Sequence, residues 1–200
     1  MTAPGIVLLL GLALSARGPD DHLMTGARHF REGRFDAALV EFRVAERLGA
    51  TDAAGYAGAS LVKLRRPEEA LEAFAAAGEG SRDALLDYYR ALACYDARLF
   101  LCADRLLASL GERSGPRIAE QTQKVRADIA AALAKEPAQE AIDWYLARCS
   151  ASADEHRPAL AAGYCREAAA LADRRNDRYR RGDALAVLAR LEEANRGARR

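Results

Sequence analysis

The sequence predicts an all-α protein, a solenoid of antiparallel helix pairs that ends in an irregular helical part. Two observations carry this prediction. One spacing of small and large residues recurs about every 33 residues, and no stretch alternates with the period of two that marks a strand. In addition, half of the 200 residues are hydrophobic, which is enough to bury a sizeable core.

The recurring spacing begins with a small residue inside a helical pattern. An alanine follows twelve residues later, and a large apolar residue follows four residues after the alanine. The three sets are Gly26, Ala38 and Phe42; Gly58, Ala70 and Phe74; and Ala91, Ala103 and Leu107. Two helices approach closely only where both present small side chains. We therefore expect the small residue and the alanine of each set to face each other within a helix hairpin.

The remaining helices are predicted from turn signals and from a change in the phase of the repeat. Residues 32–34 (Glu-Gly-Arg) end the first helix, and Pro67 opens the fourth at a position where its missing N–H costs nothing. Residues 114–134 then read as one long connecting helix. A fourth match to the spacing follows at Tyr145, Cys149, Ala161 and Cys165. The last helix, near 177–194, is expected to cover the apolar flank of the array, as terminal helices of solenoids do.

The second helices of the first two sets resemble those of the tetratricopeptide repeat (TPR) family. They read FDAALVEF at 35–42 and PEEALEAF at 67–74. On this resemblance, residues 20–111 are expected to hold three TPR-like pairs, and residues 137–196 a fourth pair plus a capping helix. The large aromatic residue that the family carries early in its first helices is missing here, where the sequence has His22, Ala54 and Asp87.

The resemblance implies a concave groove, lined by the first helices, that binds a peptide or a protein surface. The residue after each crossing point, and those about a turn later, should point into it. These residues are Ala27, Phe30, Arg31, Ala59, Val62, Lys63, Leu92, Tyr95 and Asp96. Leu23 and Ala27 stand where the family's carboxylate clamp needs a lysine and an asparagine, so a chaperone's acidic C-terminus is not the expected ligand. In the alternative, Phe30, Val62 and Tyr95 pack between neighbouring repeats.

Four cysteines fall into two pairs, one in the third predicted hairpin and one in the fourth. The pairs are Cys94 with Cys102 and Cys149 with Cys165. In an exported protein, such pairs can form disulfides that join helices rich in alanine. In the alternative they remain thiols and pack as small buried hydrophobes. No C-x-x-C sequence occurs, which argues against a zinc knuckle and a thioredoxin-like site.

Residues 1–16 have features of a signal peptide. The stretch Ile6 to Leu14 is apolar apart from Gly11, is too short to span a bilayer and is followed by small residues, although no Lys or Arg precedes it. We therefore expect an exported protein, periplasmic or extracellular, without a membrane span after cleavage. The alternatives are a buried N-terminal helix and a cytoplasmic protein that starts at Met24.

Composition and motifs argue against an enzymatic function. No P-loop, dinucleotide-binding, nucleophile-elbow or zinc-protease motif occurs. Two of the three histidines, His22 and His29, lie seven residues apart on one predicted helix and make a poor metal site. We predict no catalytic residue, no cofactor and no metal.

The charges give little attraction for nucleic acid. Thirty Lys and Arg oppose 29 Asp and Glu, and the Arg-rich segment 174–200 is read as a solvated outer face. Contact with nucleic acid or anionic lipid through that segment stays a minor alternative. The sequence thus predicts a non-enzymatic protein-binding scaffold of the cell envelope, whose partner is another protein or a peptide segment. The rival prediction is a permanent structural subunit of a larger complex.

Overall fold

The computed structural model describes residues 18–78, 83–110, 115–135 and 137–198, and within these ranges it holds ten helices and no strand. The first six are α1 (Pro19–Arg31), α2 (Phe35–Arg47), α3 (Ala53–Lys63), α4 (Pro67–Ala76), α5 (Ala84–Asp96) and α6 (Phe100–Leu110). The last four are α7 (Pro116–Leu133), α8 (Gln139–Asp154), α9 (Pro158–Arg174) and α10 (Arg178–Ala198). None of these described helices combines the length and hydrophobicity that crossing a bilayer requires. The predicted signal sequence lies outside the described residues.

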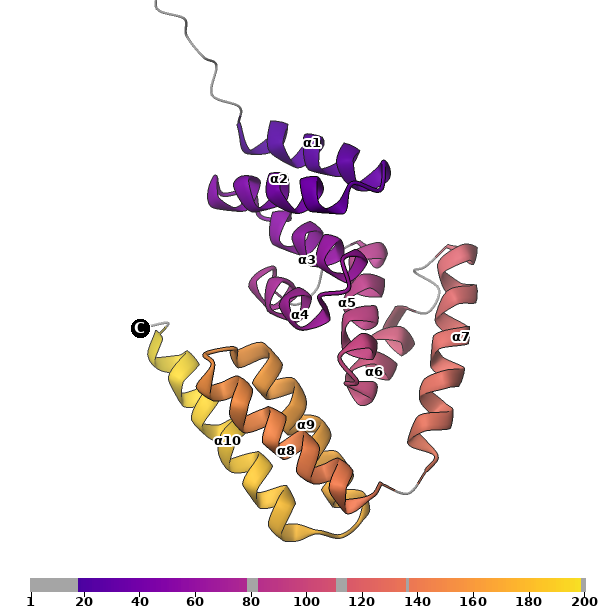
Figure 1. Cartoon of the computed structure of the whole chain (residues 1–200), viewed down its shortest axis with the longest axis vertical. Coiled ribbons are helices and arrows are strands. Elements are labelled where there is room, and N and C mark those ends of the chain that lie inside the picture. Colours follow the sequence, from indigo (N-terminus) through magenta and orange to yellow (C-terminus); the bar gives the residue numbers. More distant parts are fainter. Residues whose placement is uncertain (1–17, 79–82, 111–114, 136, 199–200) are drawn as a thin grey trace, which may run out of the picture.

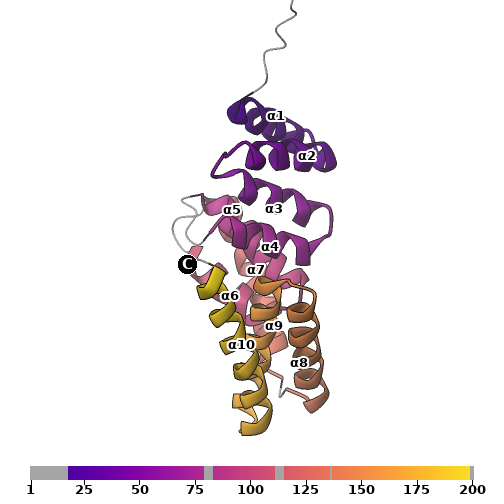
Figure 2. The ribbon, with the colours of Figure 1, turned by 90° about the vertical axis from the view of Figure 1, so that its left-hand side faces the viewer.

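The first six helices form three hairpins that follow one another in space as they do in the chain (Figure 1). Helix α2 packs on α3, and both α3 and α4 pack on α5. Helices α8, α9 and α10 form a bundle, and its α9 packs against α4 and α6 (Figure 2). The all-helical prediction is therefore confirmed, and the last three helices pack together as a unit that lies across the second helices of earlier hairpins.

The turns inside four hairpins share one backbone geometry. The second residue before the second helix has a positive φ in each case: 77° at Gly33, 59° at Arg65, 65° at Arg98 and 57° at His156. The next residue donates its N–H to the carbonyl five residues earlier, over 2.8 to 3.0 Å, which satisfies a carbonyl at the end of the first helix. The hairpin α8–α9 is thus connected by the same local turn as the first three.

The glycines inside α1 and α3 make room for aromatic rings. A Cβ on Gly26 would lie 2.7 Å from Cε1 of Phe42, and one on Gly58 would lie 3.0 Å from Cε1 of Phe74. The sequence predicted that each glycine faces the alanine of its set. The structure instead places the ring of the large residue, sixteen positions further on, closest to the glycine. Glycine is required there because any side chain would displace a buried ring.

Replacing Gly26 by alanine should lower the free energy of unfolding by about 1–2 kcal/mol. Overpacking costs about 1–3 kcal/mol, and the better helix propensity of alanine offsets up to about 1 kcal/mol of this. Urea unfolding at low protein concentration measures the change. The matched control is Gly182→Ala in α10, where nothing lies within 4 Å of the added Cβ. That variant should gain about 0.5–1 kcal/mol, and a loss in both variants would contradict the role of the Phe42 ring.

Helix α7 occupies the predicted position of the long connecting helix and covers α5 and α6. Ile129 is buried, and Ile118, Val125 and Leu133 pack half-buried on the same core. These spacings put the four side chains on one helix face. The last helix, α10, packs chiefly on α8 and α9 instead. The last helix thus lies against the predicted fourth pair, while α7 covers the third hairpin.

Carboxylates on α4 hold the start of α9. Glu72 accepts the N–H of Leu160 at 2.8 Å. Glu68 accepts hydrogen bonds from Arg157 at 2.9 Å, from the Tyr164 hydroxyl at 3.2 Å and from Arg148. The first turn of a helix has unpaired N–H groups and the positive end of the helix dipole, so acidic side chains stabilise it.

Helix α9 in turn supplies a carboxylate to the start of α6. Glu167 is 2% exposed, and its Oε1 accepts the N–H groups of Leu101 at 2.8 Å and Cys102 at 3.1 Å. The residue before α6 is Leu99, which has no side-chain acceptor for a local cap. Burial raises the pKa of Glu167 to about 7, against the effect of the two N–H bonds. The second helix of the fourth hairpin is therefore joined to the third hairpin by a buried polar contact.

Candidate protein-binding surface

The nine residues predicted to line a groove lie on the first helices of the three hairpins, α1, α3 and α5, and differ in accessibility. Arg31 and Lys63 are exposed. Half-buried side chains are those of Ala27, Phe30, Leu92, Tyr95 and Asp96, and buried ones are those of Ala59 and Val62. The set therefore does not form one continuous exposed strip.

The prediction that Ala59 and Val62 line an open groove does not fit their burial. They are 2% and 6% exposed and belong to the core that joins α3, α4 and α5. Nine of the eleven residues of α3 are buried, because α3 lies between the hairpins on both sides of it. A helix enclosed in this way has little surface left for a ligand apart from its end at Lys63.

The first helices of the three hairpins meet at the ring of Tyr89. We call the residues Phe30, Lys63 and Tyr89 together the Tyr89 patch. The ring centroids of Phe30 and Tyr89 lie 5.8 Å apart, edge to face, and the Lys63 ammonium lies 5.4 Å from the Tyr89 centroid. Phe30 also contacts Phe35, at 5.3 Å. Burial raises the pKa of Tyr89, so its phenol is neutral at physiological pH. The patch therefore presents the half-buried ring of Phe30 beside the exposed Lys63, and both contact the buried ring of Tyr89.

Further along α5, the predicted residues make contacts of their own. Tyr95 packs edge to face on Phe100 with centroids 6.0 Å apart. Asp96 pairs with Arg65 at 3.3 Å. Leu92 lies between, half-buried against two parts of the core. Since these residues follow Tyr89 at three- and four-residue intervals, α5 continues the patch along one face.

The two aromatic residues of the predicted set, Phe30 and Tyr95, bury part of their surface against neighbouring helices. Phe30 contacts the cores of the first two hairpins, and Tyr95 contacts the core of the third. The alternative prediction, that these residues pack between repeats, thus describes their inner surfaces, and their partial exposure leaves an outer surface free to bind. Sequence reasoning missed Tyr89, because its position one turn before Leu92 gave no sign that Phe30 and Lys63 would reach the same ring.

The four cysteines are placed as the two predicted pairs. Cys94 and Cys102 have a Cα separation of 5.9 Å, and Cys149 and Cys165 one of 4.9 Å, and the structure joins each pair by a disulfide. Both separations lie within the range that a disulfide accepts. The first pair joins α5 to α6 and the second joins α8 to α9, so each bridge lies within one hairpin.

The histidines on α1 take part in ordinary polar contacts. Nδ1 of His22 lies 2.7 Å from Oε2 of Glu41 on α2, and Nδ1 of His29 lies 3.9 Å from Oε2 of Glu32. Across the described ranges, no three His, Cys, Asp or Glu side chains gather as metal ligands would. His22 therefore joins α1 to α2, whereas His29 faces Glu32 at the end of its own helix.

Comparisons of the chain with models of protein families, with curated proteins and with solved structures find no significant match. The function of the protein is therefore inferred from the chain's own geometry. That geometry offers a face with aromatic side chains and exposed cations on consecutive helix hairpins.

Proposed function

We propose that this protein is a non-enzymatic scaffold that binds a segment of another protein on the face formed by α1, α3 and α5. The observation that carries the proposal is the Tyr89 patch, where residues from three successive hairpins converge. Aromatic side chains beside cations are typical of residues that contribute most binding energy at protein interfaces. Tandem helical hairpins are also suited to present such residues at fixed separations.

The charges favour a peptide that carries a carboxylate next to an apolar anchor. Arg31 and Lys63 are exposed, and within the described residues neither forms an ion pair with an acidic side chain. Phe30 directly precedes Arg31 in the chain. The Phe30 ring and the Lys63 ammonium both contact the ring of Tyr89. An apolar group of the ligand would contact Phe30, and its carboxylate would pair with either cation.

The proposed location is the cell envelope. Two paired disulfides are typical of proteins that fold in an oxidising compartment, and the apolar segment at 6–14 supports export to one. The Arg-rich C-terminal segment gives less support to nucleic-acid binding, since Arg180 pairs with Asp143 and Asp177.

A second candidate function is a permanent place in a larger complex. Val40 on α2 and Leu48 at the C-cap of that helix are 62% and 50% exposed, and they lie about two turns apart. Large exposed aliphatic residues that recur along a helix mark a surface that another protein can cover. This surface belongs to α2, so it can be separated experimentally from the face of the first helices.

Reversing the charge of Arg31 and Lys63 together should weaken peptide binding by at least about tenfold without loss of folding. Each lost charged contact at an interface rim costs about 1 kcal/mol. Peptides selected from a display library against the parent protein supply the ligands, and isothermal titration calorimetry measures their dissociation constants.

The matched control for this experiment is Arg105→Glu, which reverses an exposed arginine on α6, away from the proposed face. Thermal unfolding of all variants should agree with the parent, because exposed substitutions change stability by no more than about 0.5 kcal/mol. Equal binding by the control and by the double variant would contradict the assignment of the surface.

A further inference from the structure

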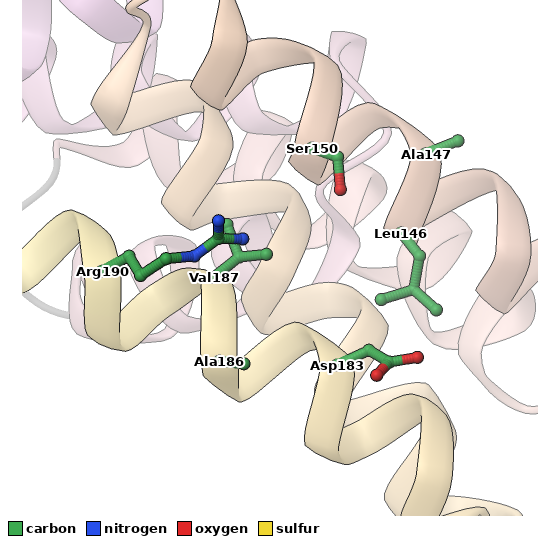
Figure 3. Close-up of a pocket in the computed structure, with 7 residues that line it drawn as sticks. All are labelled: Leu146, Ala147, Ser150, Asp183, Ala186, Val187 and Arg190. Atoms are coloured by element: carbon green, nitrogen blue, oxygen red, sulfur yellow. The ribbon is translucent and has the colours of Figure 1, made fainter.

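The outer side of the C-terminal bundle contains an open groove between α8 and α10 (Figure 3). Its volume is about 430 Å³. Leu146 and Ser150 line it from α8, and Asp183, Ala186, Val187 and Arg190 line it from α10. Val187 is buried at the floor and Ala186 is exposed, so the middle of the α10 side consists of small and apolar side chains with a charge at each end.

One face of α10 is uncovered along most of its length. Tyr179, Asp183, Ala186 and Arg190 follow one another at intervals of three or four residues, which places them on the same side of the helix. All four are exposed, and Tyr179 reaches 80%. An aromatic ring exposed to this degree on an ordered helix leaves a large apolar surface in water, which association with another surface would remove.

The two charges on this face lack partners within the described part of the chain. Arg180 and Arg181, which point elsewhere on α10, form ion pairs with Asp143, Asp177 and Asp173. No ion pair or hydrogen bond of the Asp183 carboxylate or the Arg190 guanidinium is found among the described residues. They lie seven residues apart, which is about 10 Å along the axis.

We propose that a second copy of this chain covers this face, with the two α10 helices antiparallel about a two-fold axis next to Ala186 and Val187. An acid and a base at equal distances on either side of such an axis are complementary to themselves. Asp183 of each copy then meets Arg190 of the other, which makes two identical ion pairs. The small Ala186 side chains at the axis let the helices approach closely.

The same symmetry gives the exposed ring of Tyr179 a place to pack. Tyr179 and Ala194 lie at equal distances from the axis, so each ring faces the small, exposed Ala194 region of the other copy. The apolar centre at Val187 and Leu146 becomes enclosed between the two copies. Interfaces of this kind, with an apolar centre and charges at the edge, are usual for homodimers. The inference is independent of the peptide-binding surface on α1, α3 and α5.

The test is a charge-reversal series measured by sedimentation velocity over a range of protein concentrations. The parent should form dimers at the higher concentrations. Asp183→Arg and Arg190→Asp should each raise the dimer dissociation constant at least about tenfold, because each replaces two attractive contacts by two repulsive ones. Circular dichroism should show both variants folded, since both positions are exposed. Asp128→Arg on the exposed side of α7 is the control and should dimerise like the parent.

Mixing the two single variants distinguishes this antiparallel pairing from other modes of association. In a mixed dimer, the base that D183R introduces meets the acid that R190D introduces. The second pair joins the native Arg190 of the first chain to the native Asp183 of the other. The mixture should therefore form heterodimers although each variant alone is monomeric. A parent that stays monomeric at every concentration, single variants that dimerise normally, or a mixture that remains monomeric would each overturn the proposal.

Discussion

Replacing Cys149 and Cys165 by alanine should lower the free energy of unfolding by about 4 kcal/mol under oxidising conditions, of which about 3 kcal/mol comes from the disulfide and about 1 kcal/mol from lost packing. The bridge closes a loop with a sequence separation of 16, and the loss of chain entropy in the unfolded state that such a loop implies is about 3 kcal/mol. The two cysteines are fully buried between α8 and α9, so the variant also loses packing. Denaturant unfolding with and without a reducing agent measures the change.

The reducing agent separates the bridge from the packing. Without the bridge, parent and variant differ only by the small cavities that alanine leaves, which cost about 1 kcal/mol. The disulfide between Cys94 and Cys102, with a separation of 8, should contribute less, at about 2.5 kcal/mol. Alkylation of the protein isolated from its host should find no free thiol. Free thiols, together with the same difference under both conditions, would show that the cysteines act only as packing residues and would remove support for export.

Replacing Glu167 by glutamine should make the protein more stable than the parent at pH 8 but not at pH 4. The amide oxygen of glutamine can still accept the N–H groups of Leu101 and Cys102, so the cap of α6 is kept. The carboxylate differs because it must ionise in a buried site. Burial raises the pKa of Glu167 from 4.5 to about 7.

The sign of the pH effect follows from these two values. Below about pH 4.5 the carboxyl group is protonated in both the folded and the unfolded chain. As the pH rises to 7, the unfolded chain releases its proton first, which favours unfolding and removes about 3 kcal/mol of stability from the parent. The stability of the glutamine variant relative to the parent should increase by this amount across the window. Unfolding in urea at a series of pH values measures it.

A surface substitution controls for the loss of one negative charge. Glu120→Gln changes an exposed carboxylate on α7, and its effect should stay within about 0.5 kcal/mol. A parent and Glu167→Gln variant with parallel pH profiles would contradict the assignment of a buried carboxyl group at the start of α6.

Local spacing predicted the helices but not the contacts between distant hairpins. Gly26 with Phe42 and Gly58 with Phe74 marked hairpins because helices in direct contact constrain each other's residue sizes at a fixed interval. The bond from Glu167 to the start of α6 spans 66 positions along the chain and leaves no periodic trace. The packing of α9 on α4 could therefore not be predicted from the sequence.

The surface was harder to predict than the hairpins for a related reason. Periodicity tells which residues share a helix face, but a face buried against another hairpin and a face open to solvent have similar compositions when alanine is abundant. Ala59 and Val62 share the predicted side with Lys63, yet only Lys63 lies beyond the neighbouring helices. The positive φ of Arg65, Arg98 and His156 could not be predicted from the sequence either, because glycine is the residue that usually marks such turns.

Site-specific photo-crosslinking in the native host tests the proposed scaffold function most directly. A photoreactive amino acid at position 63, at the Tyr89 patch, is compared with one at position 40 on the exposed side of α2 and one at position 105 on α6. Binding on the face of the first helices predicts one defined adduct with another protein from position 63, and none from position 105. Adducts from position 40 alone would favour the permanent complex. Equal adducts from all three positions, or none from position 63, would contradict a binding surface on α1, α3 and α5.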